Sequence, residues 1–147
     1  MSKVGRAAFA ASRSRLEVVS ASKTIDKNES GELLAVDAGG AVVLTLPTDP
    51  ENGTRYSIWI IDDVTGGTVT VQAAAADAFQ GAVSFADSDT DAHIVVVKAD
   101  GVTTDDDLLT IAADTLQGSW VEVVYDKTNT RWLVCGVIHA VTAPTFG

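Results

Sequence analysis

Short segments in which apolar and polar residues alternate with a period of two place the strongest constraint on how this chain folds. Two segments show the pattern most clearly, and their one-sided apolar positions are Val42, Leu44 and Leu46 in the first and Tyr56, Ile58 and Ile60 in the second. Pro47 ends the first segment, because proline has no N–H to donate to a strand ladder. This period is typical of half-buried β-strands.

Segments of this kind recur along the chain, and no segment has a convincing helical pattern. They lie at 16–19, 32–36, 41–46, 55–62, 68–72, 83–85, 93–98, 108–111, 119–125 and 131–135. Turn signals separate them roughly every 8–12 residues, the spacing of sandwiches and jelly rolls. We therefore predict an all-β fold, a compact antiparallel β-sandwich or jelly-roll-like domain of about ten short strands over residues 16–142. An extended arm precedes it at residues 1–15, and an irregular tail follows at residues 143–147.

Two strand predictions are more specific. Residues 93–98 are apolar on both faces, so we expect this strand inside a sheet that is covered on both sides. Residues 119–125 and 131–135 are β-rich and flank a five-residue polar loop, which predicts a hairpin.

Charge is segregated along the chain. Ten Lys or Arg and twenty Asp or Glu give a formal net charge of -10. Residues 1–15 contain four cations and no acid, so they carry +4, and the six cations and twenty acids that remain give residues 16–147 a charge of -14. An acidic body repels phosphate backbones, which argues against a general nucleic-acid binder. No apolar run approaches the roughly 18–20 residues of a membrane helix, so we expect no membrane partner.

The basic arm allows three interpretations. It is a solvated terminus, a short organelle transit peptide, or a segment that orders on an acidic partner or on the acidic body of a neighbouring copy. In the third case opposite charge supplies the attraction and one aromatic side chain supplies an anchor. The contact candidates are then Lys3, Arg6, Phe9, Arg13 and Arg15.

No arrangement of residues typical of an enzyme stands out. The chain has two histidines, His93 and His139, and it lacks a nucleophile elbow, a Walker loop, a Rossmann glycine pattern and an HExxH motif. Cys135, the single cysteine, lies in a predicted strand, where we expect it to behave as a small buried hydrophobe. We predict no catalytic residues and no cofactor.

Acidic clusters are the remaining candidates for a ligand site. Residues 87–91 place a carboxylate at every second position, as the start of a calcium loop does. Ala92 stands where the tight-turn glycine of an EF-hand belongs, and Lys98 stands where the bidentate glutamate belongs. Further loop carboxylates lie at 62–63 and 105–107. We interpret them as solvated turns and predict no metal, with a calcium site shared between loops or subunits as the alternative.

Trp59 is the candidate interface residue. It alternates with Tyr56, Ile58 and Ile60, so it points away from the face that those residues share. Either a second core layer or loop covers it, or it lies at a subunit interface, where large aromatic side chains are enriched.

Several motifs together resemble small all-β structural proteins of tailed bacteriophages. A strand that ends in Leu-Pro is followed by glycine and an aromatic strand, and a late hairpin carries tryptophan followed by aliphatic residues. These motifs lie at Ser30–Leu34, Val42–Pro47, Asn52–Tyr56, Gly118–Val123 and Thr130–Val134. The compact size resembles capsid cement (decoration) proteins.

The resemblance implies a non-enzymatic role. It implies a homotrimer on the outer capsid surface of the virion that binds the major capsid protein, bridges neighbouring capsid subunits and so stabilises the shell. The alternative within phages is a tail or head fibre or spike module that binds a host glycan or another virion protein. Apart from this resemblance, a third class of function is a secreted or lumenal carbohydrate-binding sandwich, with or without dependence on calcium.

Overall fold

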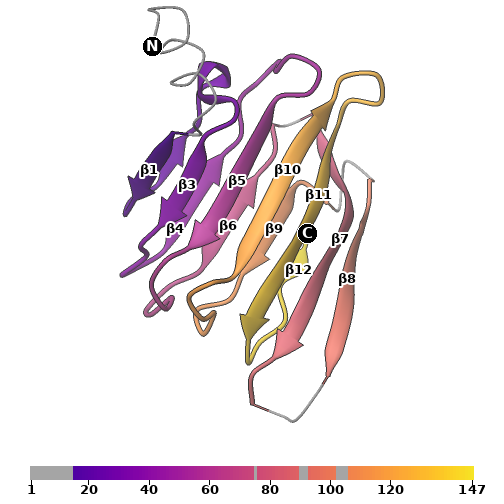
Figure 1. The fold of residues 1–147 in the computed structure, drawn as a ribbon. Helices are drawn as coiled ribbons and strands as arrows, with labels where there is room; N and C mark the ends of the chain where they lie inside the picture. Colours follow the sequence, from indigo (N-terminus) through magenta and orange to yellow (C-terminus); the bar gives the residue numbers. More distant parts are fainter. Residues whose placement is uncertain (1–14, 75, 90–92, 102–105) are drawn as a thin grey trace, which may run out of the picture.

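The fold is a sandwich of two β-sheets (Figure 1). The computed structural model describes residues 15–74, 76–89, 93–101 and 106–147, so Lys3, Arg6, Phe9 and Arg13 lie outside the described residues. In chain order the elements are β1 (Leu16–Val19), β2 (Lys23–Thr24), the short 3-10 helix η1 (Lys27–Glu29), β3 (Leu33–Val36), β4 (Val42–Thr45), β5 (Arg55–Ile60), β6 (Val69–Gln72), β7 (Ala78–Asp87), β8 (Ile94–Asp100), β9 (Leu108–Ile111), β10 (Trp120–Asp126), β11 (Arg131–Ala140) and β12 (Thr145–Phe146). The predicted all-β architecture is confirmed.

The two sheets differ in width. One has seven strands in the order β1-β3-β5-β10-β11-β7-β8, and the other has five in the order β12-β9-β6-β4-β2. Their facing sides enclose the core, which includes the predicted inward residues Val42, Leu44 and Leu46 and Tyr56, Ile58 and Ile60. Trp132 is fully buried between Tyr56 and Tyr125, with ring centroids 6.1 and 4.9 Å away.

The N-terminal half winds as a flattened coil, which corrects the prediction of an antiparallel sandwich. From β1 to β6 each successive strand moves to the other sheet, so strands that follow each other in sequence do not pair. Strands two apart lie side by side and run in the same direction: β1 with β3, β2 with β4, β3 with β5, and β4 with β6. The alternation of residues shows which strands exist, but parallel and antiparallel pairing leave the same period of two.

The C-terminal half supplies the antiparallel pairs. β10 and β11 form the predicted hairpin, and β10 also pairs antiparallel with β5. β7 lies parallel to β11 and antiparallel to β8. Gly81 of β7 has φ of 139°, and a Cβ atom there would lie 2.2 Å from the carbonyl oxygen of Val134. This close approach requires glycine, since other residues are strained at that angle.

The structure overturns the prediction for residues 93–98. β8 is an edge strand of the seven-stranded sheet, and Ile94, Val95 and Val96 are all exposed. The sheet that covers the inner face has only five strands, so it leaves the edge of the wider sheet uncovered.

Two smaller predictions are also wrong. The tail is not irregular, because β12 pairs with β9 and Phe146 packs on the core, with its ring 6.0 Å from that of Phe79. Cys135 is exposed and not buried, because it lies on the outward side of β11. Strand alternation alone could not tell which side of this apolar strand faces the second sheet.

Candidate functional site

A row of in-register side chains crosses the outer face of the whole seven-stranded sheet. Its members, here called the tryptophan row, are Val18, Ala35, Trp59, Trp120, Val137, Ser84 and Val96, one from each strand. All except Ser84 are apolar. At its centre the rings of Trp59 and Trp120 stack with centroids 5.9 Å apart. Since outward positions of an open sheet are ordinarily polar, this row is the most unusual surface feature of the fold.

The face around the row mixes exposed apolar side chains with charged ones. Large side chains that share this side of the sheet and are exposed are Leu16, Val18, Trp59, Ile94, Val96, Leu133 and Val137. The charged residues on the same side balance in sign, with Arg55, Lys98 and Arg131 against Asp100, Glu122 and Asp126. A body of charge -14 therefore presents one broad face that is electrically balanced.

The size of this face suits a protein interface. Seven strands at a spacing of about 4.8 Å, each of about seven residues at about 3.4 Å, cover roughly 800 Å². A standard interface buries about 800 Å² on each partner. No second layer covers Trp59 within the described residues, and 36% of its surface is exposed, so it is not part of a second core layer.

Cys135 lies beside the tryptophan row. It is cross-strand neighbour to Glu122 on β10 and to Ala82 on β7. Partial burial raises the pKa of its thiol, and the negative charge of Glu122 raises that pKa further. The thiolate form is therefore disfavoured, which does not suit a nucleophile. The single cysteine is instead a natural probe of this face.

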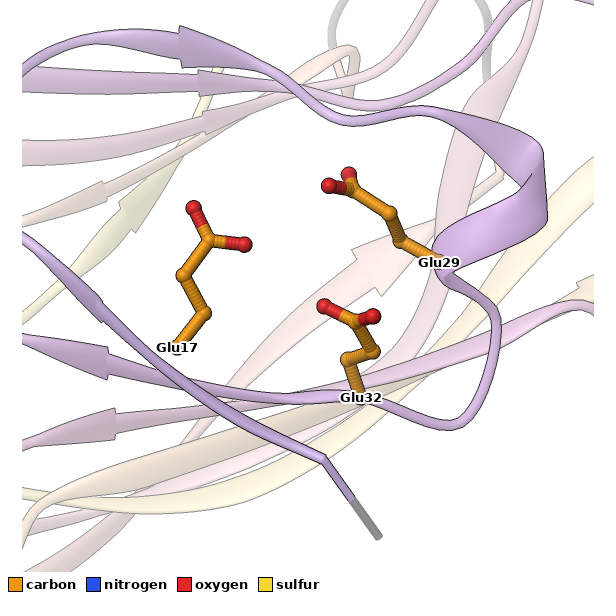
Figure 2. A group of neighbouring side chains, drawn as sticks. All are labelled: Glu17, Glu29 and Glu32. Carbon is orange, nitrogen blue, oxygen red and sulfur yellow. The ribbon is translucent and has the colours of Figure 1, made fainter. Parts of the chain in front are cut away.

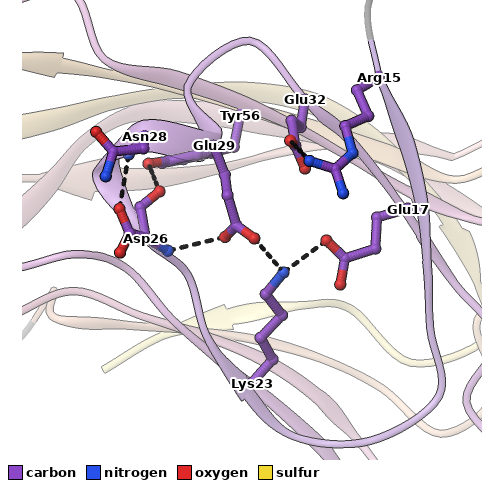
Figure 3. A network of polar contacts seen from close by, with 8 residues as sticks. All are labelled: Arg15, Glu17, Lys23, Asp26, Asn28, Glu29, Glu32 and Tyr56. Atoms are coloured by element: carbon purple, nitrogen blue, oxygen red, sulfur yellow. Dashed lines mark hydrogen bonds and ion pairs between the residues drawn. The ribbon is translucent and has the colours of Figure 1, made fainter.

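A second polar constellation lies at the start of the coil. Figure 2 shows the carboxylates of Glu17, Glu29 and Glu32 converging from β1, from η1 and from the residue that precedes β3. One oxygen from each lies within 4.8 Å of the others. The Lys23 ammonium donates to Glu17 Oε2 at 2.6 Å and to Glu29 Oε1 at 2.7 Å, as Figure 3 shows. We call these three glutamates the carboxylate cluster.

Backbone contacts hold this cluster in place. Asp26 caps η1 by accepting from the Asn28 N–H at 2.8 Å, and Glu29 Oε2 accepts from the Asp26 N–H at 2.8 Å (Figure 3). The Tyr56 hydroxyl donates to the Asp26 carbonyl at 2.9 Å. This capping box orients Glu29 before any ligand arrives.

The ion pairs shift the pKa values of two groups. Burial acts to lower the pKa of Lys23, but its hydrogen bonds to Glu17 and Glu29 outweigh burial and raise that pKa. Burial acts to raise the pKa of Glu29, but hydrogen bonds from Lys23 and from the Asp26 backbone outweigh it and lower that pKa. Both groups are therefore held in their charged forms.

Arg15 is the one predicted arm contact that the structure describes. Its guanidinium lies 3.3 Å from Glu32 Oε1, although most of its side chain is exposed. The root of the arm is thus tied to the carboxylate cluster of its own body (Figure 3). Nothing in the sequence pattern indicated this partner, since residues 15 and 32 meet only because β1 and β3, which they precede, pair side by side.

The predicted loop carboxylates differ in their surroundings: Asp62 and Asp63 are exposed, whereas Asp106 is not. Asp106 is buried, and its Oδ2 accepts from the N–H groups of Asp100 at 2.7 Å and Gly101 at 3.0 Å, which corrects its interpretation as a solvated turn residue. Asp63 accepts from the Gln117 N–H at 2.8 Å. Residues 90–92 and 102–105 lie outside the described residues, so the calcium-like pattern over 87–91 is described only in part.

Neither protein-family models nor curated proteins match this chain. Among the described residues, no helix is both long and apolar enough to cross a membrane.

Proposed function

We propose that this protein is a non-catalytic structural subunit of a tailed-phage virion, a capsid cement protein that binds the outer shell as a homotrimer and bridges neighbouring capsid subunits. The tryptophan row carries the proposal. An exposed row of apolar side chains across a whole sheet is costly to leave in water, and apolar patches with a polar rim mark interaction sites.

A second copy of the chain is the occupant that best suits this face. Two bodies of charge -14 repel each other least when they meet at faces of balanced charge, and the outer face has three charged residues of each sign. Trp59 and Trp120 lie at the centre of the face, where large aromatic residues contribute most to association. We therefore assign Trp59 to the subunit interface.

We assign the contact with the capsid shell to the basic arm. Lys3, Arg6, Phe9 and Arg13 precede β1, and the ion pair between Arg15 and Glu32 fixes the point at which the arm leaves the body. An arm that orders on binding adds contact area at a surface of opposite charge. The major capsid protein is the proposed partner.

A fibre or spike module is the second candidate. The coil formed by β1–β6 favours it, because each turn of such a coil pairs with the next and its first turn offers the open edges β1 and β2. In that case the apolar face still joins subunits, and a host glycan or another virion protein is the ligand.

Light scattering combined with thiol labelling tests the self-association. A homotrimer should appear at micromolar concentration, and Cys135 should react with a maleimide more slowly as the concentration rises, because the partner covers its face. A monomer with concentration-independent labelling contradicts the proposal.

The virion role is tested separately. The full chain should bind expanded phage shells, and deletion of residues 1–15 should abolish binding while the trimer persists. Localisation by cryo-electron microscopy should place the protein on the outer shell; density in a fibre or tail would support the second candidate.

A further inference from the structure

We propose that Glu17, Glu29 and Glu32 form a Ca²⁺ site, in which the cation takes the place of the Lys23 ammonium between the three carboxylates. The inference does not depend on the proposed function. Its starting observation is that Glu32, 7% exposed, has a carboxylate oxygen, Oε2, that is buried and has no hydrogen-bond partner. A buried carboxylate oxygen without a partner is costly, so this atom indicates a missing ligand.

Lys23 does not satisfy every carboxylate oxygen of the cluster. Its ammonium reaches Glu17 and Glu29, and Arg15 reaches Glu32 only through Oε1. An ammonium has only three N–H donors, whereas Ca²⁺ accepts six to eight oxygen ligands. A Ca²⁺ ion at the centre can therefore contact all three carboxylates at once. Figure 2 shows the carboxylates facing a common space.

The spacing of the carboxylates matches Ca²⁺. The three ligand oxygens lie within 4.8 Å of one another. Ca²⁺ binds oxygen at about 2.3–2.6 Å, so oxygens on opposite sides of the ion are up to roughly 5 Å apart. Mg²⁺ demands near-ideal octahedral geometry and keeps several of its waters, so a site of three protein carboxylates suits it less. The ligand set therefore favours the larger ion.

The charge balance agrees with this assignment. Three carboxylates with Lys23 and Arg15 leave the site with one net negative charge. Replacement of the ammonium by Ca²⁺, with Arg15 retained, makes the site neutral. Lys23 can leave because its side chain is 21% exposed and lies on the two-residue strand β2 at a sheet edge.

The bound ion would connect three separate segments. Glu17 lies on β1, Glu29 closes η1, and Glu32 directly precedes β3. Ca²⁺ would hold the first turn of the coil closed and would fix the root of the arm through Glu32 and Arg15. Binding to the folded chain raises the melting temperature, which gives a readout that needs no activity.

Thermal unfolding of the full chain in EGTA and in about 5 mM CaCl₂, with isothermal titration by CaCl₂ alone, tests the site; sites of this kind bind at about 10⁻⁴–10⁻³ M. We expect a Ca²⁺-dependent rise in melting temperature that MgCl₂ does not reproduce. Glu32→Gln should abolish the rise. Glu51→Gln, an exposed glutamate away from the cluster, is the matched control and should keep it. Glu17→Gln, at a half-buried position, repeats the test if Glu32→Gln does not fold.

Lys23→Met separates a calcium site from a purely structural ion-pair network. Loss of the competing ammonium removes two charged hydrogen bonds that Ca²⁺ must otherwise displace, so we expect affinity to rise by at least about tenfold. If Ca²⁺ has no effect on the natural chain, the proposal is overturned. This holds even if Lys23→Met responds to Ca²⁺, because the Lys23 ammonium then occupies the site in the natural chain. An equal response in Glu32→Gln and the natural chain likewise overturns it, since binding would then lie elsewhere on the acidic surface.

Discussion

Replacement of Trp59 by serine is the sharpest test of the apolar face. Trp59 exposes 36% of its surface in the single chain. A tryptophan offers about 250 Å², so roughly 90 Å² remain to be buried, which is worth about 2 kcal/mol per copy at about 25 cal/mol/Å². Trp59→Ser should therefore weaken each subunit contact by roughly 30-fold.

The substitution also costs stability within the single chain. About 160 Å² of Trp59 is covered there, partly by the stacked ring of Trp120, so at about 25 cal/mol/Å² the loss is up to about 4 kcal/mol, or a fall in melting temperature of roughly 8–16 °C. Association is therefore compared at temperatures where Trp59→Ser is still folded. Sedimentation equilibrium measures the association, and Val95→Ser is the control, because Val95 is comparably exposed but faces the opposite side of β8. If Trp59→Ser associates as strongly as the natural chain, or if Val95→Ser weakens association equally, the tryptophan row is not the interface.

The remaining predictions concern stability and are measured by urea or thermal unfolding. The lowered pKa of Glu29 gives a contribution to stability that is present above pH 4.5 and lost as pH falls below it. The raised pKa of Lys23 gives a contribution that is present below pH 10.5 and lost as pH rises above it. Lys23→Met should reduce the alkaline loss, of which a part remains because burial also raises the pKa values of Tyr56 and Tyr125; an unchanged alkaline limb would contradict this. Burial raises the pKa of Asp77, so Asp77→Asn should stabilise the chain at neutral pH and lose this advantage below pH 3.8, where the aspartic acid is neutral. Destabilisation at about pH 7 would show that the charge of Asp77 is favourable. Gly81→Ala should cost at least about 2 kcal/mol, because its Cβ would lie 2.2 Å from the carbonyl oxygen of the partner strand, while Gly39→Ala, with nothing within 4 Å, is the control that should be nearly neutral.

Much of the local structure was predictable because strand geometry is local. Side chains alternate sides along a strand, so the shared face of Tyr56, Ile58 and Ile60, and the opposite side for Trp59, follow from spacing alone. The hairpin of β10 and β11 was equally local, since its strands are joined by a short polar loop. These predictions needed no knowledge of which strand lies beside which.

The predictions that failed depended on neighbours distant in sequence. The apolar run in β8 suggested a covered strand, but its position at the edge of the wider sheet leaves it exposed. Cys135 has mostly apolar neighbours in the sequence, and yet its side chain lies on the exposed face of the sheet. Asp106 appeared to be a loop carboxylate and is instead buried as an acceptor for two backbone N–H groups.

The tryptophan row and the carboxylate cluster both bring together residues that are distant in sequence. Alternating residues determine by themselves that this chain is all-β and which side of most strands faces inward. The distribution of charged residues along the sequence likewise determines that a basic segment precedes an acidic one. The tertiary structure alone decides that Val18 and Val96 end a row with the stacked Trp59 and Trp120 near its centre, and that Glu17, Glu29 and Glu32 converge. The physical reason is that a period of two specifies a side of a strand, whereas the order and direction of strands depend on pairing between distant segments.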